Sequence, residues 1–343
     1  MTDFSSKIID WYAIHKRDLP WRDTTDPYKI WLSEIILQQT RVDQGYNYYL
    51  KFIKHYPTIV DLANASEQQV LNDWQGLGYY SRARNLHATA KIVAMDFGGK
   101  FPTSYEEIIK LKGIGPYTAA AIASFAFREV KALVDGNVYR VLSRYFDIAT
   151  PIDSTIGKKT FQQLADQLIS TENPDVHNQA IMEFGSQQCV PVRPNCNVCV
   201  LQNNCQSLLN DTVALRPVKQ GKIKVRKRYF YYLLFEEGSK ICVQKRESNK
   251  DIWQHLYEFP LLEYAEQQDL NDITELVKRD YGIEVTSISN QVSHILSHQK
   301  LLVHFIHCDG IPHSMQSLTV DRMDLSEIPL PRLIDRYLEQ VWS

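Results

Sequence analysis

The sequence lacks the features that mark membrane, fibrous and disordered proteins. No apolar run approaches the roughly 18 residues that a bilayer-spanning helix requires, and the longest runs cover only residues 119–127 and 230–235. Glycine and proline are scarce, with 14 of each in 343 residues, so tight turns are few and helical structure is favoured. The N-terminus has no basic segment followed by an apolar one, which argues against secretion and predicts a cytoplasmic, reducing environment.

The sequence also lacks an excess of charge of one sign. Its formal net charge is -2, so any surface that binds an anion must be local. One basic segment lies between residues 211 and 228, where it is either a solvated linker between domains or a strip that follows a phosphate backbone. It contains Arg216, Lys219, Lys222, Lys224, Arg226, Lys227 and Arg228, with Asp211 as its acidic residue.

Cysteine is rare as well, but its distribution is informative. Four of the six cysteines have the spacing C-x6-C-x2-C-x5-C, namely Cys189, Cys196, Cys199 and Cys205. Four converging thiolates hold either a [4Fe-4S] cluster or tetrahedral zinc. The cluster is favoured, because zinc sites more often use two C-x2-C pairs, and it would either transfer electrons or fix a loop. Cys242 and Cys308 lie alone in strand-like segments and are expected in the core.

A chain of this length is expected to form two domains. Residues 1–210 repeat apolar positions at intervals of three and four and predict a mostly α domain. Residues 211–227 are predicted to be a basic linker. Residues 228–343 predict an α+β domain, with strands at 229–235, 240–245 and 301–307 and a helix at 269–281.

Two turns in the helical half contain a Gly-x-Gly pair. Residues 111–122 have the form of a hairpin between two helices, in which Gly113 and Gly115 expose backbone amides and Pro116 suits the first helical turn. Amides at a helix N-terminus bind phosphate, although a plain helix–helix turn would have the same sequence. Residues 76–84 add two tyrosines and two arginines, which suit DNA contacts or simply an aromatic-anchored turn.

Two further segments place carboxylates near helices. Residues 31–41 predict a helix in which Glu34, Gln38 and Arg41 share one face, a face that is usually solvated. Asp135 and Asn137 precede a helical run, where either would ordinarily be an N-cap. A carboxylate at the positive end of a helix also stays ionised readily, which suits the stabilisation of a cation.

In this order, the segments resemble adenine DNA glycosylases of the MutY type, within the helix-hairpin-helix, endonuclease III-like superfamily. The resemblance spans nearly the whole chain. It rests on residues 19–22, 33–40, 76–86, 111–122, 134–140 and 178–180 and on the four cysteines. It implies removal of adenine mispaired with 8-oxoguanine or guanine in duplex DNA, in base excision repair, and a nucleoid location if the source is bacterial.

The resemblance implies roles for individual residues. Glu34 would be the general acid that protonates adenine, and Asp135 would stabilise the cationic sugar, with Tyr117 and Asn137 close by. Breaking an N-glycosidic bond does need a protonated leaving base and a nearby anion. The DNA-contacting residues would be Arg17, Trp21, Arg22 and Gln179 in the adenine pocket, Gln39 and Tyr79 as wedges in the duplex, Thr40 and Leu77 near 8-oxoguanine, and Gly113 and Gly115 in the hairpin.

One hairpin position separates subclasses of the superfamily. Bifunctional relatives carry a lysine there that forms a Schiff base, whereas this sequence has Tyr117. The resemblance therefore implies a monofunctional enzyme that leaves an abasic site. Lys112, one helical turn away, is the amine that would give any residual strand cleavage.

The second half resembles the Nudix-like domain with which the family reads 8-oxoguanine. The glutamate cluster of the catalytic Nudix box is missing from residues 271–282, so pyrophosphohydrolase activity is not expected. Ser297 and His298 would contact the lesion, although Leu296 stands where family members often have phenylalanine. A monomer that binds duplex DNA is expected.

Two other functions compete with this interpretation. One is an endonuclease III-like or thymine-mismatch glycosylase with a different base pocket, against which Glu34 and the second domain argue. The other is a cluster-bearing DNA-binding protein or redox sensor without enzymatic activity. That protein would lose nothing when Glu34 is replaced by glutamine.

Overall fold

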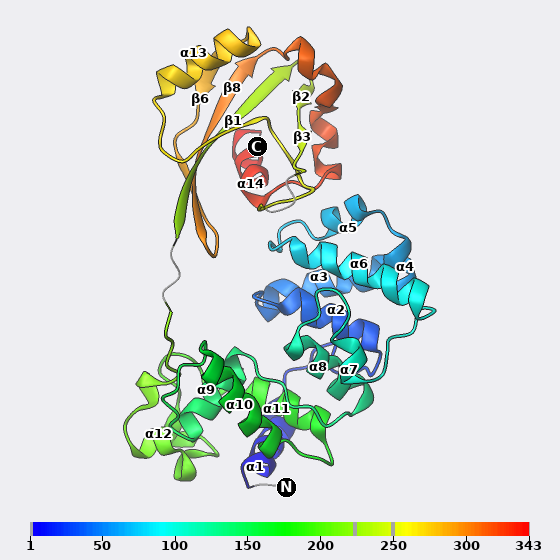
Figure 1. Ribbon diagram of the computed structural model, residues 1–343, viewed down its shortest axis with the longest axis vertical. Coiled ribbons are helices and arrows are strands. Elements are labelled where there is room, and N and C mark those ends of the chain that lie inside the picture. The colour runs from blue at the N-terminus through cyan, green and yellow to red at the C-terminus, as the bar shows by residue number, and fades with distance from the viewer. Residues whose placement is uncertain (1–2, 222–224, 248–250, 343) are drawn as a thin grey trace. The chain divides into compact units, whose positions relative to one another are not determined.

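The computed structural model describes residues 3–221, 225–247 and 251–342 and contains two compact units. The first unit, Met1–Asn64 with Asn85–Gly221, is helical, and the second, Ala65–Arg84 with Lys222–Ser343, contains the sheet (Figure 1). The predicted fold class, a mostly α half followed by an α+β half, is confirmed. Lys222 and Lys224 of the basic segment lie outside the described residues. In the described parts of the chain, no helix combines the length and apolar character needed to cross a bilayer.

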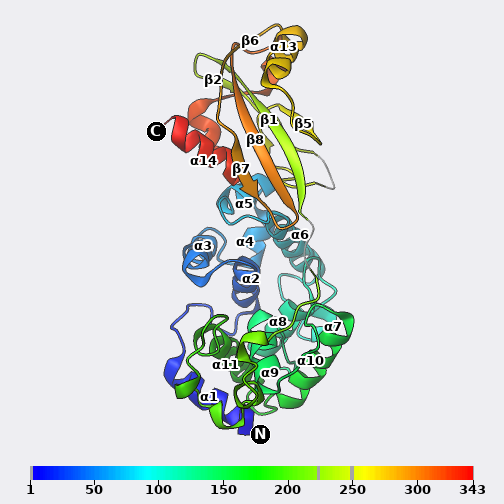
Figure 2. The same cartoon turned by 90° about the vertical axis from the view of Figure 1, so that its left-hand side faces the viewer.

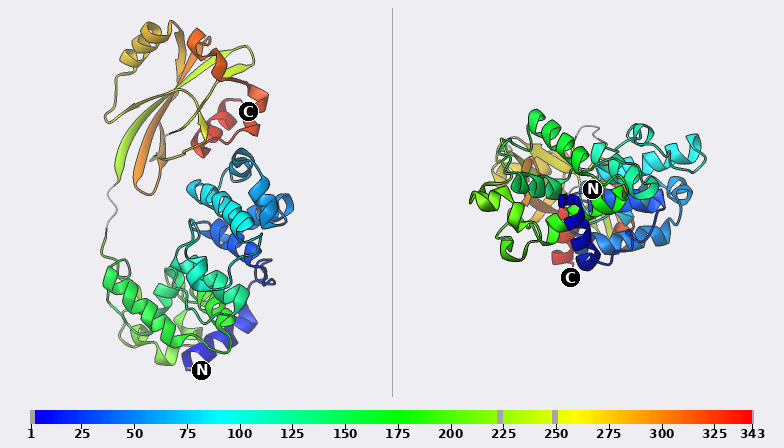
Figure 3. Two further views of the ribbon diagram at one scale, coloured as in Figure 1. Left: turned by 45° about the vertical axis from the view of Figure 1, so that its right-hand side comes forward. Right: turned by 90° about the horizontal axis from the view of Figure 1, so that it is seen from below.

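The first unit is built from helices of one to four turns. They are α1 (Asp3–His15), α2 (Pro27–Leu37), α3 (Val42–His55), α4 (Ile59–Asn64), most of α6 (Ser81–Asp96), α7 (Tyr105–Ile108), α8 (Pro116–Phe127), α9 (Gly136–Tyr145), α10 (Thr155–Leu168), α11 (Pro174–Gln187) and α12 (Gln206–Leu209). Short 3-10 turns cover Cys196–Val198, Gln202–Asn204 and Val213–Leu215. α11 packs against α1, α8 and α9, and α2 packs against α3 and α8 (Figure 3).

Helix α2 starts and ends four residues earlier than the predicted helix at residues 31–41. It begins at Pro27, after Asp26 accepts a hydrogen bond from the Tyr28 amide at 2.9 Å. It ends at Leu37, because Gln38 is extended and Gln39 takes a positive φ of 55°. The predicted helical face of Glu34, Gln38 and Arg41 is therefore wrong, since Arg41 is the N-cap residue of α3. No glycine or proline marks this stop in the sequence.

The predicted hairpin lies between α7 and α8. Its first helix is only four residues long, whereas α8 has twelve and starts with Pro116 after Gly115. Gly113 has a φ of 75°, and a Cβ on it would lie 2.6 Å from Asn85 Cβ, so the turn requires glycine at this position. Gly115 has an ordinary φ of -91°.

Residues 65–84 belong to the second unit, although their helical periodicity placed them in the first domain. They include α5 (Glu67–Asp73) and the first turn of α6. The Tyr80 hydroxyl donates to the Leu330 carbonyl at 3.1 Å, and Arg84 Nη1 donates to the Gln254 carbonyl at 2.7 Å. Sequence periodicity cannot reveal such long-range bonds.

The rest of the second unit is a mixed sheet between two helices (Figure 2). Its elements are β1 (Arg226–Glu237), β2 (Lys240–Cys242), β3 (Gln244–Lys245), β4 (Tyr257–Glu258), β5 (Leu261–Tyr264), α13 (Leu270–Tyr281), β6 (Glu284–Ile288), β7 (Val292–Ile295), β8 (Gln299–Asp309), β9 (Thr319–Asp321) and α14 (Arg332–Val341), with 3-10 turns at His313–Leu318 and Arg322–Glu327. The strand order is β6-β8-β1-β2-β9, with β5 on β1 and β7 on β8. The predicted strand at 240–245 is two short strands that pair with different partners.

Strand β1 is buried on both faces, which explains its continuous run of apolar and aromatic residues. It pairs in parallel with β8 from Arg226 to Glu236, so it is longer than the predicted 229–235. Phe230, Tyr232 and Leu234 join the core that α14 covers, and Tyr231, Leu233 and Phe235 join the core that α13 covers. Cys242 and Cys308 are 0% and 2% exposed, as predicted for core residues.

Two arginines of the basic segment are engaged in internal ion pairs. Arg228 is 4% exposed in β1 and binds Asp251 at 2.6 Å and Glu263 at 2.7 Å. Arg216 pairs with Asp147 at 2.9 Å. The interpretation of the segment as a phosphate-binding strip is therefore wrong for these two residues.

Candidate active site

A cavity of about 450 Å³ opens in the helical unit. Its walls come from α2, α8 and α11, from the loop after α1, from the turn between α2 and α3, and from the residues that start α9. Nine residues predicted for the site line it, namely Arg17, Trp21, Arg22, Glu34, Thr40, Tyr117, Asp135, Asn137 and Gln179. Segments that are more than a hundred residues apart in sequence thus meet at one cavity.

The two predicted catalytic carboxylates face the same cavity from different elements. Glu34 lies in the middle of α2, and Asp135 is the N-cap of α9. Tyr117, in the first turn of α8, hydrogen bonds to Glu34, and its hydroxyl lies 3.3 Å from Met182 Sδ in α11. The hairpin therefore contributes to the cavity through its tyrosine.

Glu34 has the more strongly perturbed acidity of the pair. Enclosure by protein raises its pKa from 4.5 to about 7, and the nearby charge of Asp135 adds to the rise, while the Tyr117 hydrogen bond and Arg22 act in the opposite direction. Glu34 is thus protonated in a large fraction of molecules near neutral pH. A protonated carboxyl can serve as a general acid.

Asp135 is held by hydrogen bonds that suit its charged form. Its Oδ1 accepts from the Val138 amide at 2.7 Å, and its Oδ2 accepts from Asn137 Nδ2 at 2.7 Å. Arg140 Nη2 in turn donates to Asn137 Oδ1 at 2.8 Å and fixes the orientation of that amide. Burial outweighs the effect of these bonds, so the pKa of Asp135 is raised above its ordinary value of 3.8, and the bonds limit that rise. Asp135 is therefore both the N-cap that the sequence indicated and a carboxylate that faces the cavity.

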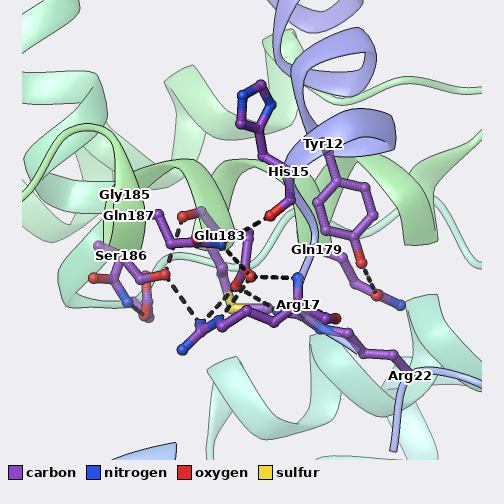
Figure 4. Close-up of polar contacts among 12 residues, drawn as sticks. Tyr12, His15, Arg17, Arg22, Gln179, Glu183, Gly185, Ser186 and Gln187 are labelled. Carbon is purple, nitrogen blue, oxygen red and sulfur yellow. Dashed lines mark hydrogen bonds and ion pairs between the residues drawn. The ribbon is translucent and has the colours of Figure 1, made fainter. Parts of the chain in front are cut away.

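Sequence reasoning missed a charged residue of the cavity. Glu183, on α11, is 1% exposed and binds both Arg17 and Arg22 (Figure 4). Burial acts to raise its pKa, but the hydrogen bonds from the two arginines lower the pKa to about 2. The available signal was its position four residues after Gln179, which places both on one helical face.

Other predicted residues lie away from the cavity. In the first unit, Gln39 follows α2, and Gly113 and Gly115 form the exposed turn before α8. In the second unit, Leu77 is buried, and the turn between β7 and β8 carries exposed Ser297 and His298. The Tyr79 hydroxyl hydrogen bonds to Ser297 Oγ at 2.8 Å, so the structure brings a predicted wedge residue and a predicted lesion contact together.

The four clustered cysteines line a second, smaller cavity in the helical unit. It has a volume of about 30 Å³ and is lined by Cys189, Cys196, Cys199 and Cys205. Arg144, from α9, places Nη1 3.4 Å from Cys189 Sγ. Within residues 3–221, 225–247 and 251–342, no set of three or more Cys, His, Asp and Glu side chains is arranged as a metal site. The four thiols nevertheless form a donor set that fits a thiolate-bound metal centre.

Comparisons with known proteins agree with the two kinds of structure in the chain. Residues 32–167 match the HhH-GPD superfamily of base excision DNA repair proteins, and residues 230–340 match the NUDIX domain. A solved thermostable thymine-DNA glycosylase is similar with a TM-score of 0.57 and 31% identity, covering 60% of this chain and 95% of that one. A structure of an endonuclease III–DNA complex has the same fold, with a TM-score of 0.53, 19% identity, and coverage of 61% and 95%.

A similarity over more of the chain is found with an adenine DNA glycosylase of Buchnera aphidicola subsp. Baizongia pistaciae (strain Bp). The two are 39% identical over 306 residues, which span 88% of this chain and 84% of that protein. The match extends well beyond the part shared with the thymine-DNA glycosylase, and it confirms the resemblance drawn from the motifs. This chain belongs to the adenine DNA glycosylase family.

Proposed function

We propose that this DNA N-glycosylase hydrolyses the N-glycosidic bond of adenine mispaired with 8-oxoguanine or guanine in duplex DNA and leaves an abasic site. The observation that carries the proposal is the pair of carboxyl groups in one cavity. Glu34 is protonated in a large fraction of molecules near neutral pH, whereas Asp135 is bound by donors that favour its anion. One acid and one anion are what cleavage of a glycosidic bond requires.

The chemistry follows from these two states. Glu34 donates its proton to a ring nitrogen of adenine, the bond between the sugar C1′ and the base breaks, and the bonding electrons leave with the base. The sugar becomes an oxocarbenium-like cation, which the Asp135 carboxylate stabilises. Water then adds to C1′ and gives a proton back to Glu34, so the acid is regenerated.

The cavity supports binding of a single base outside the helical stack. Extrusion of a nucleotide costs a few kcal/mol, which contacts in the cavity would offset. Trp21 offers an aromatic surface, and Arg22 and Gln179 offer polar groups to the edge of the base. The Tyr12 hydroxyl donates to Gln179 Oε1 at 2.7 Å and so leaves the Gln179 amide nitrogen as a donor.

Tyr117 supports a monofunctional reaction. Strand cleavage by the bifunctional mechanism needs an amine that attacks C1′, and a phenol hydrogen bonded to Glu34 cannot form a Schiff base. Lys112 is exposed, next to Gly113, and lies outside the cavity lining. We therefore propose that strand breaks follow only from chemical treatment of the abasic product.

The second unit supports a role in reading the base opposite adenine. Ser297 and His298 are exposed at the tip of the hairpin between β7 and β8, and Tyr79 contacts Ser297. Leu296, in the position where family members often have phenylalanine, packs against the α14 core. We propose that Ser297 and Tyr79 contact 8-oxoguanine together and that a monomer binds the duplex.

The decisive test is single-turnover release from a duplex with adenine opposite 8-oxoguanine, analysed with and without alkali. We expect free adenine in both samples and strand breaks only after alkali. Breaks without alkali would contradict the monofunctional mechanism. Release of thymine opposite guanine, with adenine retained, would favour the thymine-mismatch alternative.

We also propose that the four cysteines hold a [4Fe-4S] cluster, which would fix the loop at residues 189–205. A full cluster supplies about four iron atoms per chain, and Cys199→Ser should lower the iron content of the anaerobically reconstituted protein far below that value. Cys242→Ala, which changes a buried cysteine of β2, should leave the iron content unchanged. Zinc without iron or sulfide in the wild-type protein would contradict the cluster.

A further inference from the structure

Glu183 is a buried carboxylate that faces the base cavity and is surrounded by donors. Its Oε1 accepts from the Arg17 amide at 3.0 Å, from Arg17 Nε at 2.8 Å and from Gln187 Nε2 at 2.5 Å. Its Oε2 accepts from Arg17 Nη2 at 2.7 Å and from Arg22 Nη2 at 2.6 Å. Figure 4 shows these groups converging from the loop after α1 and from α11. One carboxylate therefore fixes two guanidinium groups.

Contacts other than those with Glu183 also hold the two arginines in place. Arg22 Nη1 donates to the Arg17 carbonyl at 3.0 Å, and its guanidinium lies 5.6 Å from the centre of the Tyr12 ring. Arg17 Nη2 also donates to Ser186 Oγ at 3.1 Å. These contacts join the loop before α2 to α11, and both arginines line the cavity.

The charges explain why the carboxylate must reach both arginines. Two cations without an anion would repel each other in a partly buried wall, and a buried anion without cations would be strongly unfavourable. Together the three groups leave one net positive charge at the cavity wall. Arg22 also acts on Glu34, because its charge favours the ionised form of that acid.

We propose that Glu183 is a positioning residue for base selection: by holding Arg17 and Arg22 at the cavity wall, it prepares the cavity for the extruded adenine. This inference rests on the proposed function. Glu183 neither donates a proton to the base nor touches the sugar. It orients the groups that face the base, and it limits the positive charge that reaches Glu34.

The test separates recognition of the base from binding of the DNA backbone. One duplex carries 2′-fluoroadenosine opposite guanine, whose base resists release and can still enter the cavity. The other carries a tetrahydrofuran abasic analogue, which has no base. Glu183→Gln should weaken binding to the first duplex by roughly tenfold to a hundredfold, the size expected when charge-assisted hydrogen bonds are lost, and should leave binding to the second unchanged.

The pH profile gives a second measurement that a purely structural role would not change. In Glu183→Gln, Arg22 is no longer neutralised, so the pKa of Glu34 should fall. The decline of adenine release with rising pH should therefore begin at a lower pH than in the wild type. Asp175→Asn is the matched control, because Asp175 lies on the same helix and pairs with Arg128 outside the cavity. That variant should behave as the wild type in both measurements.

Glu183→Asp guards against a variant that fails to fold, because it keeps the charge. Its carboxylate is one methylene shorter and cannot reach both guanidinium groups, so we expect the same selective loss, to a smaller degree. If the wild type releases adenine, two results would overturn the inference. One is an equal loss of affinity for both duplexes. The other is wild-type affinity together with an unshifted pH profile in both Glu183 variants. Absence of adenine release by the wild type would overturn the proposed function, and this inference with it.

Discussion

Glu34→Gln should lower the single-turnover rate of adenine release by roughly 10²- to 10⁴-fold, the range for loss of a general acid, while affinity for the mismatched duplex stays close to that of the wild type. Glutamine keeps the size and hydrogen bonding of the side chain but has no proton to give to the base. Measured rates and gel-shift affinities on the same duplex check this. Glu106→Gln, which removes an exposed carboxylate paired with Lys131 at 3.0 Å, is the control and should be active.

The pH dependence follows from the same group. Since the protonated form of Glu34 is the active one, adenine release should fall as the pH rises through about 7. In Glu34→Gln, the residual rate should not vary with pH in this range. A wild-type rate that increases with pH across the same range would contradict the assignment of Glu34 as the acid.

The perturbed acid also affects folding. In the folded chain the pKa of Glu34 is about 7, whereas its ordinary value, which applies to the unfolded chain, is 4.5. Stability from this group is therefore present at low pH and lost as the pH rises between these values. Above pH 7 the charged, enclosed carboxylate destabilises the wild type, so Glu34→Gln should be more stable there, by up to about 3 kcal/mol. If Glu34→Gln is inactive but unfolds at a higher temperature than the wild type above pH 7, its loss of activity does not result from a loss of stability.

The sequence predicts the cavity better than it predicts the elements that build it. Asp135 could be placed as an N-cap because Asp and Asn before a helical run have a local physical meaning, and the structure has that bond. The end of α2 at Leu37 could not be predicted, because residues 38–41 carry no helix-breaking side chain. A local pattern reveals local geometry only.

Glu183 and residues 65–84 show the same limit at longer range. Glu183 looks like an ordinary polar position of α11, and its meaning comes from Arg17 and Arg22, more than 160 positions earlier in the chain. Residues 65–84 have a helical sequence, but Tyr80 and Arg84 bond to loops of the second unit. Partners that are distant in sequence decide these cases, and composition and periodicity do not contain that information.

Asp135→Asn should lower adenine release by roughly 10²- to 10³-fold, as expected when one preorganised electrostatic group is lost. Asparagine is as good an N-cap as aspartate, so the bond to the Val138 amide can persist. Its amide nitrogen, however, would face Asn137 Nδ2, which now donates to Asp135 Oδ2. We therefore expect a loss of stability of only about 1 kcal/mol, measured by thermal unfolding.

Asp269→Asn is the matched control for this variant. Asp269 is the N-cap of α13 in the second unit, where it accepts from the Asn271 amide at 2.8 Å, and it is exposed. The same substitution there tests capping without the cavity, so its activity should not change. If the rate of Asp135→Asn falls only in proportion to its folded fraction, Asp135 is a structural cap alone. A large loss of rate in a variant that remains folded would show that catalysis depends on the negative charge of Asp135, because asparagine can cap the helix but carries no charge.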